Sequence, residues 1–303
     1  MRLDLYTLQL FVAVIDQGGI AAAADQQHIA ASALSKRITD MERCMGVTLL
    51  TRRARGVEPT MAGLCVAKKA RLLLRRADEI SQEIREFSSG RAGNVRVGVN
   101  ASALMQFLPT DLREFQLQEP AIQIEVQEQI SSSVIRAVAE NAVDIGICVA
   151  ENSAAYDLHL FPYHRDSLTL VVPGGHPLAE GNAIHFEKTL NYNYVGMHKG
   201  SSLNNLLIAE ASKLKAQIHI RQYVTSFDAV VAMVKANIGI GVIPTGIAHK
   251  LYVSDGIRLV TLADAWAVRE LMLCIRREDE LSSSAMRLFE HLRTSVQEEV
   301  AYH

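Results

Sequence analysis

One predicted helix, over residues 31–44, constrains this chain more than any other segment. Its apolar side chains recur at every third or fourth position, at Leu34, Ile38, Met41 and Met45, which is the spacing of one helix face. Polar side chains recur with the same period on another face. That outer face carries Ser32, Ser35, Lys36, Arg37 and Thr39. The pattern predicts a helix that packs through one side and presents hydroxyl groups and cations on the other.

Two helices are predicted before this one. The first runs from about Leu3 to Gln17, and a short alanine-rich helix follows from Ile20. Gly18 and Gly19 separate them, because glycine supplies the backbone freedom that a tight turn needs. The expected inward residues of the first helix are Leu5, Leu8, Phe11, Val12 and Ile15.

Two short extended runs with three arginines follow the third helix and predict a hairpin wing. Three helices and a wing in this order form a winged helix-turn-helix, which places its third helix in the DNA major groove. Hydroxyl groups on that helix meet base edges or phosphates, and cations neutralise backbone charge. The alternatives are an ordinary solvated helix face and a solvated arginine loop. The predicted DNA-binding residues are Ser32, Ser35, Lys36, Arg37, Arg52, Arg53 and Arg55.

Residues 8–63 resemble the N-terminal domain of LysR-type transcriptional regulators. The resemblance is carried by an ordered set of motifs: Phe11-Val-Ala-Val, Ala23-Ala24, Ala33-Leu34-Ser35, Ile38, Met41-Glu42, Gly46-Val47 and Thr60-x-Ala-Gly63. It implies a regulator that reads double-stranded operator DNA.

The chain departs from the family pattern where the third helix begins. Gly19 stands where the family usually has Ser, and Ala30-Ala31-Ser32 stands where it usually has Ser-Gln-Pro or Ser-Gln-Ser. Ala30 removes an expected helix N-cap, a loss of about 1 kcal/mol. Ala31 removes a long amide that could bond a base edge. We therefore expect an altered operator preference or weaker direct readout.

A long helix is predicted over residues 60–89. Its apolar positions alternate by three and four, which is the seam of a coiled coil. The seam consists of Gly63, Val66, Ala70, Leu73, Ala77, Ile80, Ile84 and Phe87. We expect a partner helix on this seam, with packing against the chain's own body as the alternative. Two-fold pairing would present two winged helix-turn-helix domains to a pseudo-palindromic DNA site. The predicted dimerisation residues are Leu73, Ala77, Ile80, Ile84 and Phe87.

Beyond a linker at Ser88–Gly93, short strands alternate with helices, which predicts βαβ units and a parallel sheet. Two such units, joined by two crossings, resemble the periplasmic-binding-protein-like effector domain of the same family. The expected fold class is α/β, with a winged helix-turn-helix over 1–62, a linker and dimerisation helix over 60–90, and an effector-binding domain over 91–303. Subdomain I is expected at 91–162 plus 269–303, and subdomain II at 163–268.

An effector site is expected beyond the carboxyl ends of the strands, where helix N-termini carry partial positive charge. By resemblance, the residues that line it are Asn100, Ser102, Ser131, Ser201, Ser202 and Phe227. Simple N-capping is the alternative for each serine. Hydroxyl groups and helix N-termini favour a small organic anion as the effector, although the sequence does not identify an arginine that would bind the anion. The connections near Phe161–Asp166 and Asp264–Arg269 are expected to act as hinges.

Composition excludes several other classes. The net charge is -2, so DNA affinity has to come from a local patch. No apolar run reaches the length of a membrane span, and cytoplasm is the expected location. Four cysteines lie far apart without CxxC spacing, which argues against zinc and a disulfide framework and favours small buried hydrophobes.

No catalytic motif, metal site or cofactor fingerprint is found, so the chain is not expected to be an enzyme. The expected partners are operator DNA, a small effector, one or three further copies of the chain, and RNA polymerase, with no membrane. The alternative is a solute-binding or enzymatic α/β protein whose N-terminal module only looks like a DNA-binding one.

Overall fold

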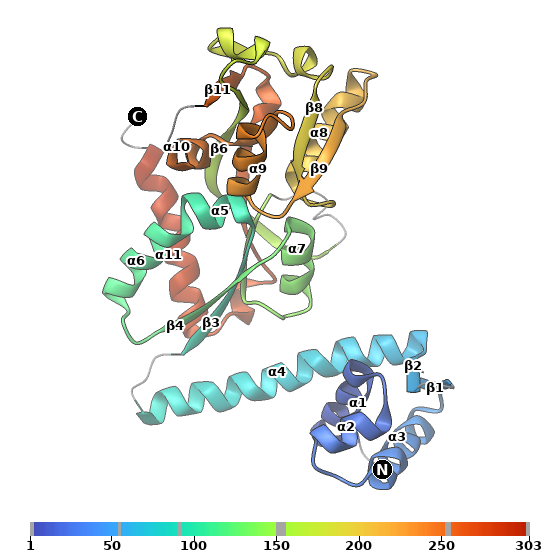
Figure 1. The fold of residues 1–303 in the computed structure, drawn as a ribbon. Helices are drawn as coiled ribbons and strands as arrows, with labels where there is room; N and C mark the ends of the chain where they lie inside the picture. The colour runs from blue at the N-terminus through green and yellow to red at the C-terminus, as the bar shows by residue number, and fades with distance from the viewer. Residues whose placement is uncertain (1–2, 54–55, 90–92, 150–155, 252–255, 301–303) are drawn as a thin grey trace. The chain divides into compact units, whose positions relative to one another are not determined.

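The structure is a computed structural model that describes residues 3–53, 56–89, 93–149, 156–251 and 256–300. The chain falls into two compact units, unit 1 (residues 1–91) and unit 2 (residues 92–303). Each is described by itself (Figure 1). No helix in the described part of the chain is long and apolar enough to cross a membrane.

Unit 1 has the predicted winged helix-turn-helix architecture. Its elements are α1 (Leu5–Gln17), α2 (Ile20–Gln26), α3 (Ala31–Met45), β1 (Leu50–Arg53), β2 (Gly56–Pro59) and α4 (Met61–Ser89). The Asp4 carboxylate starts α1 by accepting from the backbone N–H of Thr7 at 2.8 Å, a bond that lowers the pKa of Asp4. Gly18, at φ 65°, ends the helix in the left-handed conformation that glycine adopts readily. The two strands of the wing pair antiparallel, with Arg53 opposite Gly56.

The inward face predicted for α1 was partly wrong. Leu5 is 47% exposed, whereas Leu10 and Val14 are completely buried. The reason is that α1 packs against α2, α3 and α4 together, so its buried arc is wider than a single stripe and is rotated away from Leu5.

The predicted seam of α4 divides into two environments. Ala67 and Ala70 are each 1% exposed and belong to the core of unit 1, so this stretch of α4 packs against the other helices of the same unit. Farther along, Leu73 is 49% exposed and Ile80 is 59% exposed. The side chains of Ile84 and Phe87 lie outside the described residues. Only the part from Leu73 onward is therefore available to a partner helix.

Ten strands are described in unit 2. They are β3 (Asn94–Val99), β4 (Gln123–Glu128), β5 (Ile145–Cys148), β6 (His159–Pro173), β7 (Ala183–Ile184), β8 (Asn193–Met197), β9 (His219–Val224), β10 (Gly241–Pro244), β11 (Ile257–Leu262) and β12 (Val268–Ile275). The main sheet has the order β4-β3-β5-β12-β6-β11-β7, with β10 also on β6, and β8 pairs separately with β9.

The expected all-parallel sheet is a mixed sheet. The pairs β3–β4, β3–β5 and β8–β9 are parallel, but β6 and β12 pair antiparallel with their neighbours. The chain leaves the first half of the unit along β6 and returns to it along β12, so these two strands run in opposite directions.

Seven α-helices are described in unit 2: α5 (Ala101–Gln106), α6 (Leu108–Gln118), α7 (Ser131–Ala139), α8 (Ser202–Lys213), α9 (Phe227–Lys235), α10 (Thr245–Leu251) and α11 (Ser283–Val300). Short 3₁₀ helices lie at Pro177–Glu180, Phe186–Thr189, Ala265–Ala267 and Glu278–Glu280. Ile147 packs in the core with α11 and the adjacent Cys148 packs in the cluster with α7, so the two helices cover opposite faces of the sheet.

The sequence pattern predicts one helix from Leu104 to Leu117, but the structure has α5 and α6 with a break at Phe107. Pro109 has no backbone N–H to donate to the carbonyl of Met105, four residues earlier. That carbonyl instead accepts from Lys250 Nζ at 2.8 Å. The break therefore ties α5 to α10.

Of the two segments expected to be hinge connections, the first lies within a strand, and the second is mostly the 3₁₀ helix Ala265–Ala267 followed by the start of β12. Phe161–Asp166 lies within β6, and β12 begins at Val268, opposite Ser167. Asp166 is paired with Arg269, and a register shift lies between Glu270 and Met272. Unit 2 has two hydrophobic cores: Tyr163 and Leu271 belong to one, and Leu168 and Ala267 belong to the other. The bulged ladder of β6 and β12 links these two cores.

The four cysteines divide equally between surface and interior. Cys148 and Cys274 are buried as expected, but Cys44 and Cys65 are exposed, because they lie on the outer sides of α3 and α4. The Cys148 side chain, by hydrogen bonding, and burial both raise the pKa of the Cys274 thiol. Burial and this hydrogen bond therefore favour the neutral thiol form of Cys274.

Candidate functional site

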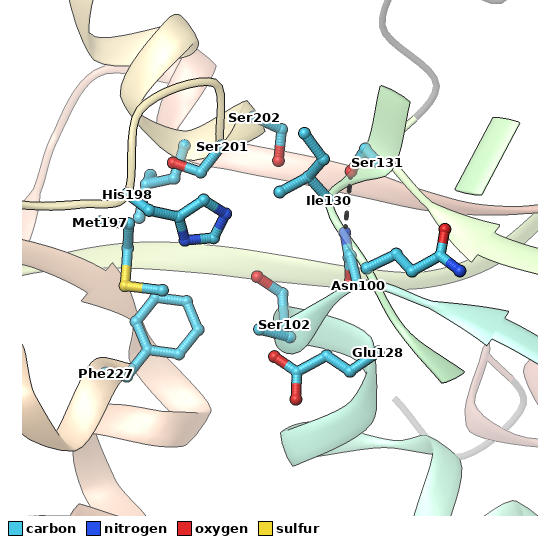
Figure 2. Close-up of a pocket in the computed structure, with 13 residues that line it drawn as sticks. Asn100, Ser102, Glu128, Ile130, Ser131, Met197, His198, Ser201, Ser202 and Phe227 are labelled. Carbon is cyan, nitrogen blue, oxygen red and sulfur yellow. Dashed lines mark hydrogen bonds between the residues drawn. The ribbon is translucent and has the colours of Figure 1, made fainter. Parts of the chain in front are cut away.

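A cavity of about 300 Å³ opens in unit 2 where several strands end. Asn100 follows β3, Glu128 ends β4, and Met197 ends β8. All six residues predicted for the effector site line this one cavity, and Figure 2 shows most of them facing a common gap. Those six are Asn100, Ser102, Ser131, Ser201, Ser202 and Phe227. Their role as ligand contacts stays a prediction.

Several lining residues were missed by the sequence analysis. Glu128, His198 and Met197 lie in the cavity wall, and Ile130 and Leu203 add apolar surface. The rule that selected Asn100, its place at the end of a strand, would also have found Glu128 and Met197. Their contribution to the wall depends on strand lengths, which the sequence pattern left uncertain by a few residues.

Two of the predicted residues also cap helices. Asn100 Oδ1 accepts from the backbone N–H of Ala103 at 2.9 Å, and Ser201 Oγ accepts from that of Asn204 at 3.3 Å. Asn100 Nδ2 additionally donates to Ser131 Oγ at 3.3 Å. Capping, the alternative given for each serine, therefore occurs at Ser201, and Asn100 caps a helix as well. Both residues still line the cavity wall.

Ser131 lies at the start of α7, a helix that has no side-chain cap. Ile130 occupies the N-cap position and offers no acceptor. The first amide groups of an uncapped helix need another partner, either water or a ligand. At α9 the opposite holds, because the Ser226 hydroxyl accepts from the N–H of Ala229 and its hydrogen bond to Asp228 lowers the pKa of that carboxyl.

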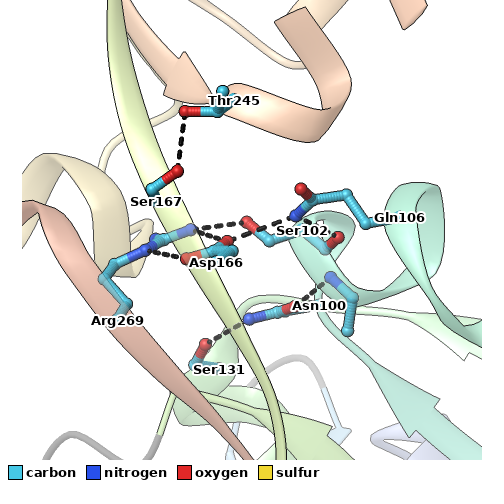
Figure 3. A network of polar contacts seen from close by, with 9 residues as sticks. Asn100, Ser102, Gln106, Ser131, Asp166, Ser167, Thr245 and Arg269 are labelled. Atoms are coloured by element: carbon cyan, nitrogen blue, oxygen red, sulfur yellow. Dashed lines mark hydrogen bonds and ion pairs between the residues drawn. The ribbon is translucent and has the colours of Figure 1, made fainter. Parts of the chain in front are cut away.

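A buried ion pair lies directly behind the cavity wall (Figure 3). Arg269 Nε donates to Asp166 Oδ1 at 2.9 Å, and Arg269 Nη2 donates to the other oxygen of the same carboxylate. Arg269 Nη2 also donates to Ser102 Oγ at 3.2 Å, and Gln106 Nε2 donates to Asp166 at 3.2 Å. The side chains of Arg269 and Asp166 are 5% and 1% exposed. The pair joins β6, β12 and α5 at one point.

The predicted DNA-binding residues of α3 differ in their solvent exposure and in the contacts that they already make. Ser32 and Lys36 are exposed and Ser35 is half-buried. Arg37, by contrast, donates to Thr7 Oγ1 at 3.1 Å and lies 5.1 Å from the centroid of the Tyr6 ring. Arg37 therefore holds α3 against α1, and a phosphate would have to compete with those contacts.

The wing places Arg53 at the surface, where its Nε donates to Glu58 at 3.0 Å. Arg55 and the side chain of Arg52 lie outside the described residues. As expected, Ala30 occupies the N-cap position of α3 and provides no side-chain cap.

Comparison with known proteins identifies the class. Residues 5–64 match the model of the bacterial regulatory helix-turn-helix protein, LysR family, and residues 88–297 match the LysR substrate binding domain. Together the two matches span nearly the whole chain. The chain belongs to the LysR-type family of transcriptional regulators: it is a DNA-binding regulator with an effector-binding domain.

Individual relatives agree with this assignment. The chain is 29% identical over 297 residues to the uncharacterized HTH-type transcriptional regulator YbhD of Escherichia coli K12, covering 95% of this chain and 90% of that protein. Full-length CbnR in complex with its target DNA has a TM-score of 0.69 at 19% identity, covering 97% and 100% of the two chains. The effector binding domain of QuiR in complex with shikimate has a TM-score of 0.61 at 20% identity, covering 68% and 98%.

This family consists of transcriptional regulators, which are not enzymes. The helix-turn-helix match favours a regulator over a solute-binding protein. Within the described residues, no group of three or more His, Cys, Asp or Glu side chains could hold a metal ion.

The buried ion pair leads to a first prediction. Asp166→Ala leaves the Arg269 guanidinium buried without a counter-charge, and we expect the free energy of unfolding of unit 2 to fall by about 3–5 kcal/mol. Chemical denaturation followed by circular dichroism measures this loss. The double variant Asp166→Leu/Arg269→Met should recover much of it, because an apolar pair needs no counter-charge.

The matched control is Arg277→Ala, which breaks an ion pair with Asp279 in which both side chains are more than half exposed. Screened surface pairs contribute little, so this variant should unfold like the unmodified protein. If Asp166→Ala and Arg277→Ala unfold alike, the buried pair does not stabilise the crossing.

Proposed function

We propose that this regulator binds a pseudo-palindromic operator as a dimer, and that a small organic molecule in the cavity of unit 2 changes that binding or its transcriptional outcome. The observation that carries the proposal is the convergence on one cavity of six polar and aromatic residues drawn from separate strand ends. The similar effector binding domain of QuiR, solved in complex with shikimate, supports a small acid as the ligand of such a domain. The proposed partners also include RNA polymerase, with assembly to a tetramer as a further step and the cytoplasm as the place of action.

In this proposal α3 reads the operator and the wing holds its phosphates. Ser32 and Lys36 are exposed on α3, and Arg53 is exposed on the wing. Because α3 lacks both the cap and the long amide that the family usually has, direct readout depends on fewer side chains. Phosphate contacts then supply a larger share of the affinity.

Neutralising the wing tests the DNA interface. In Arg52→Ala/Arg53→Ala/Arg55→Ala, we expect weaker binding to all duplexes and a shallower dependence of log K on log salt concentration, by about 0.9 per lost phosphate contact. Fluorescence anisotropy over a salt series measures both. The control Arg113→Ala/Arg136→Ala/Arg258→Ala removes the same charge from exposed positions of unit 2 and should keep the original slope. An unchanged slope in the wing variant would remove the wing from the interface.

The second half of the α4 seam is the proposed dimer contact. Leu73 and Ile80 are each about half exposed in the single chain, and Ala77 lies between them in the seam. Burying these side chains against a second copy removes apolar surface from water, which stabilises association. Ile84 and Phe87 complete the proposed contact from the sequence pattern alone.

The variant Ile80→Asp tests this contact. An aspartate there would be buried without a partner, and we expect analytical ultracentrifugation to show a smaller species with poor operator affinity. Lys69→Asp, at an exposed position of the same helix outside the seam, is the control and should sediment like the unmodified protein. Assembly that survives Ile80→Asp would show that α4 is not the main contact.

Substitutions that fill the cavity test whether the effector binds there. Ser102→Trp and, at the half-buried rim, Ser202→Trp should each abolish the thermal stabilisation by small carboxylates and the ligand response of a reporter gene. Ser202→Trp is the safer variant because Ser202 is not a helix cap and does not contact the buried ion pair. Loss of operator binding together with the response would indicate misfolding. A full response in both variants would place the effector elsewhere.

A further inference from the structure

The charges around the cavity differ from those of a site built for strongly anionic ligands. Among the described residues that line it, Glu128 is the one carboxylate, His198 is the one imidazole, and neither lysine nor arginine occurs. Arg269 lies behind Ser102, but its charge is matched by Asp166 at hydrogen-bond distance. The described wall therefore offers a negative charge and no unmatched permanent positive charge.

One side of the cavity can still receive a single carboxylate. Ser131 and Ser201 are more than nine-tenths buried, and Ser202 begins α8 beside them. The uncapped start of α7 adds backbone N–H donors. Neutral donors of this kind solvate one carboxylate without a cation, as helix N-termini do for anions generally.

The other side presents an acceptor. Figure 2 shows the Glu128 carboxylate beyond Ser102, away from Ser131, Ser201 and Ser202. Its side chain is exposed at the cavity edge, so its carboxylate oxygens are open to a ligand there. A second carboxylate on a ligand would be repelled there, whereas an ammonium or hydroxyl group would donate to it.

Apolar groups also line the cavity. Met197, Phe227 and Leu203 are almost fully buried, and Figure 2 shows Ile130 beside Ser131 and Ser202, across the gap from Met197. Figure 2 places Phe227 and Met197 together on one wall. Such a surface suits a ring or a short hydrocarbon segment, which is excluded from water when it lies against these side chains.

We propose that the effector is a small monocarboxylate with an apolar middle and a hydrogen-bond donor, an amino or hydroxyl group, that faces Glu128, and that dicarboxylates are disfavoured. This inference rests on the proposed function of the cavity, and it narrows the expected organic anion to a ligand with a single carboxylate. Glu128 is then the residue that determines specificity.

The test uses the full-length protein and three probes that differ at one end only: 4-(aminomethyl)benzoate, 4-(hydroxymethyl)benzoate and benzene-1,4-dicarboxylate. Isothermal titration calorimetry should give the first two a Kd at least about fivefold lower than the third, the size of one favourable or unfavourable charge contact. In Glu128→Gln, the dicarboxylate should gain about fivefold and the aminomethyl probe should lose about fivefold.

Glu125→Gln is the matched control, since it removes the same charge from the same strand at an exposed position outside the cavity wall. It should leave all three Kd values unchanged. A dicarboxylate that binds the unmodified protein as tightly as the other probes, or preferences that Glu128→Gln does not alter, would overturn the inference. The effector function would still stand if Ser202→Trp abolished that binding.

Absence of binding by all three probes at millimolar concentration would also overturn the inference about ligand class. The proposed function fails separately, when Ser102→Trp and Ser202→Trp leave the reporter response intact. The two failures are therefore distinguishable.

Discussion

The buried pair of Arg269 and Asp166 lies where the two halves of unit 2 depend on each other. The chain passes from one core to the other along β6 and returns along β12, and these residues face each other at that crossing. Two opposite charges removed from water stay favourable only while both remain in place with their hydrogen bonds satisfied. The pair therefore holds the register of the ladder, and through Ser102 and Gln106 it also holds the two ends of α5.

The described wall of the cavity combines hydroxyl, amide and apolar groups and contains neither lysine nor arginine. The arginine behind it is held by Asp166, so Ser102 receives a hydrogen bond from a guanidinium whose charge is already matched. A ligand that bonds Ser102 acts on the same network that holds the crossing. Relative movement of the two halves then requires changes in the bulged ladder of β6 and β12, which is stiffer than a pair of loops.

In unit 1, the first part of α4 lies in the core and a later part lies at the surface. The first part of α4 places Ala67 and Ala70 against α1, where small side chains allow close packing. The later part exposes Leu73 and Ile80. A continuous heptad pattern thus covers both an internal contact and a surface left for another chain, because the body of unit 1 extends along only the first turns of a 29-residue helix.

The sequence alone determined the order of elements, the winged helix-turn-helix, the family and the six residues that line the cavity. The elements follow from local periodicity and turn residues, which act over a few neighbouring positions. The family and the six cavity residues follow from resemblance to the LysR-type pattern, together with the rule that ligands lie beyond strand ends. The tertiary structure alone decided which side of α1 is buried, where the α4 seam leaves the core, and that the supposed hinge at Phe161–Asp166 lies within a paired strand. It also placed Arg269 against Asp166 and Glu128 in the cavity wall. Those features depend on contacts between separate elements, such as that of Asp166 with Arg269, which lie 103 residues apart in the sequence, and no local pattern encodes such contacts.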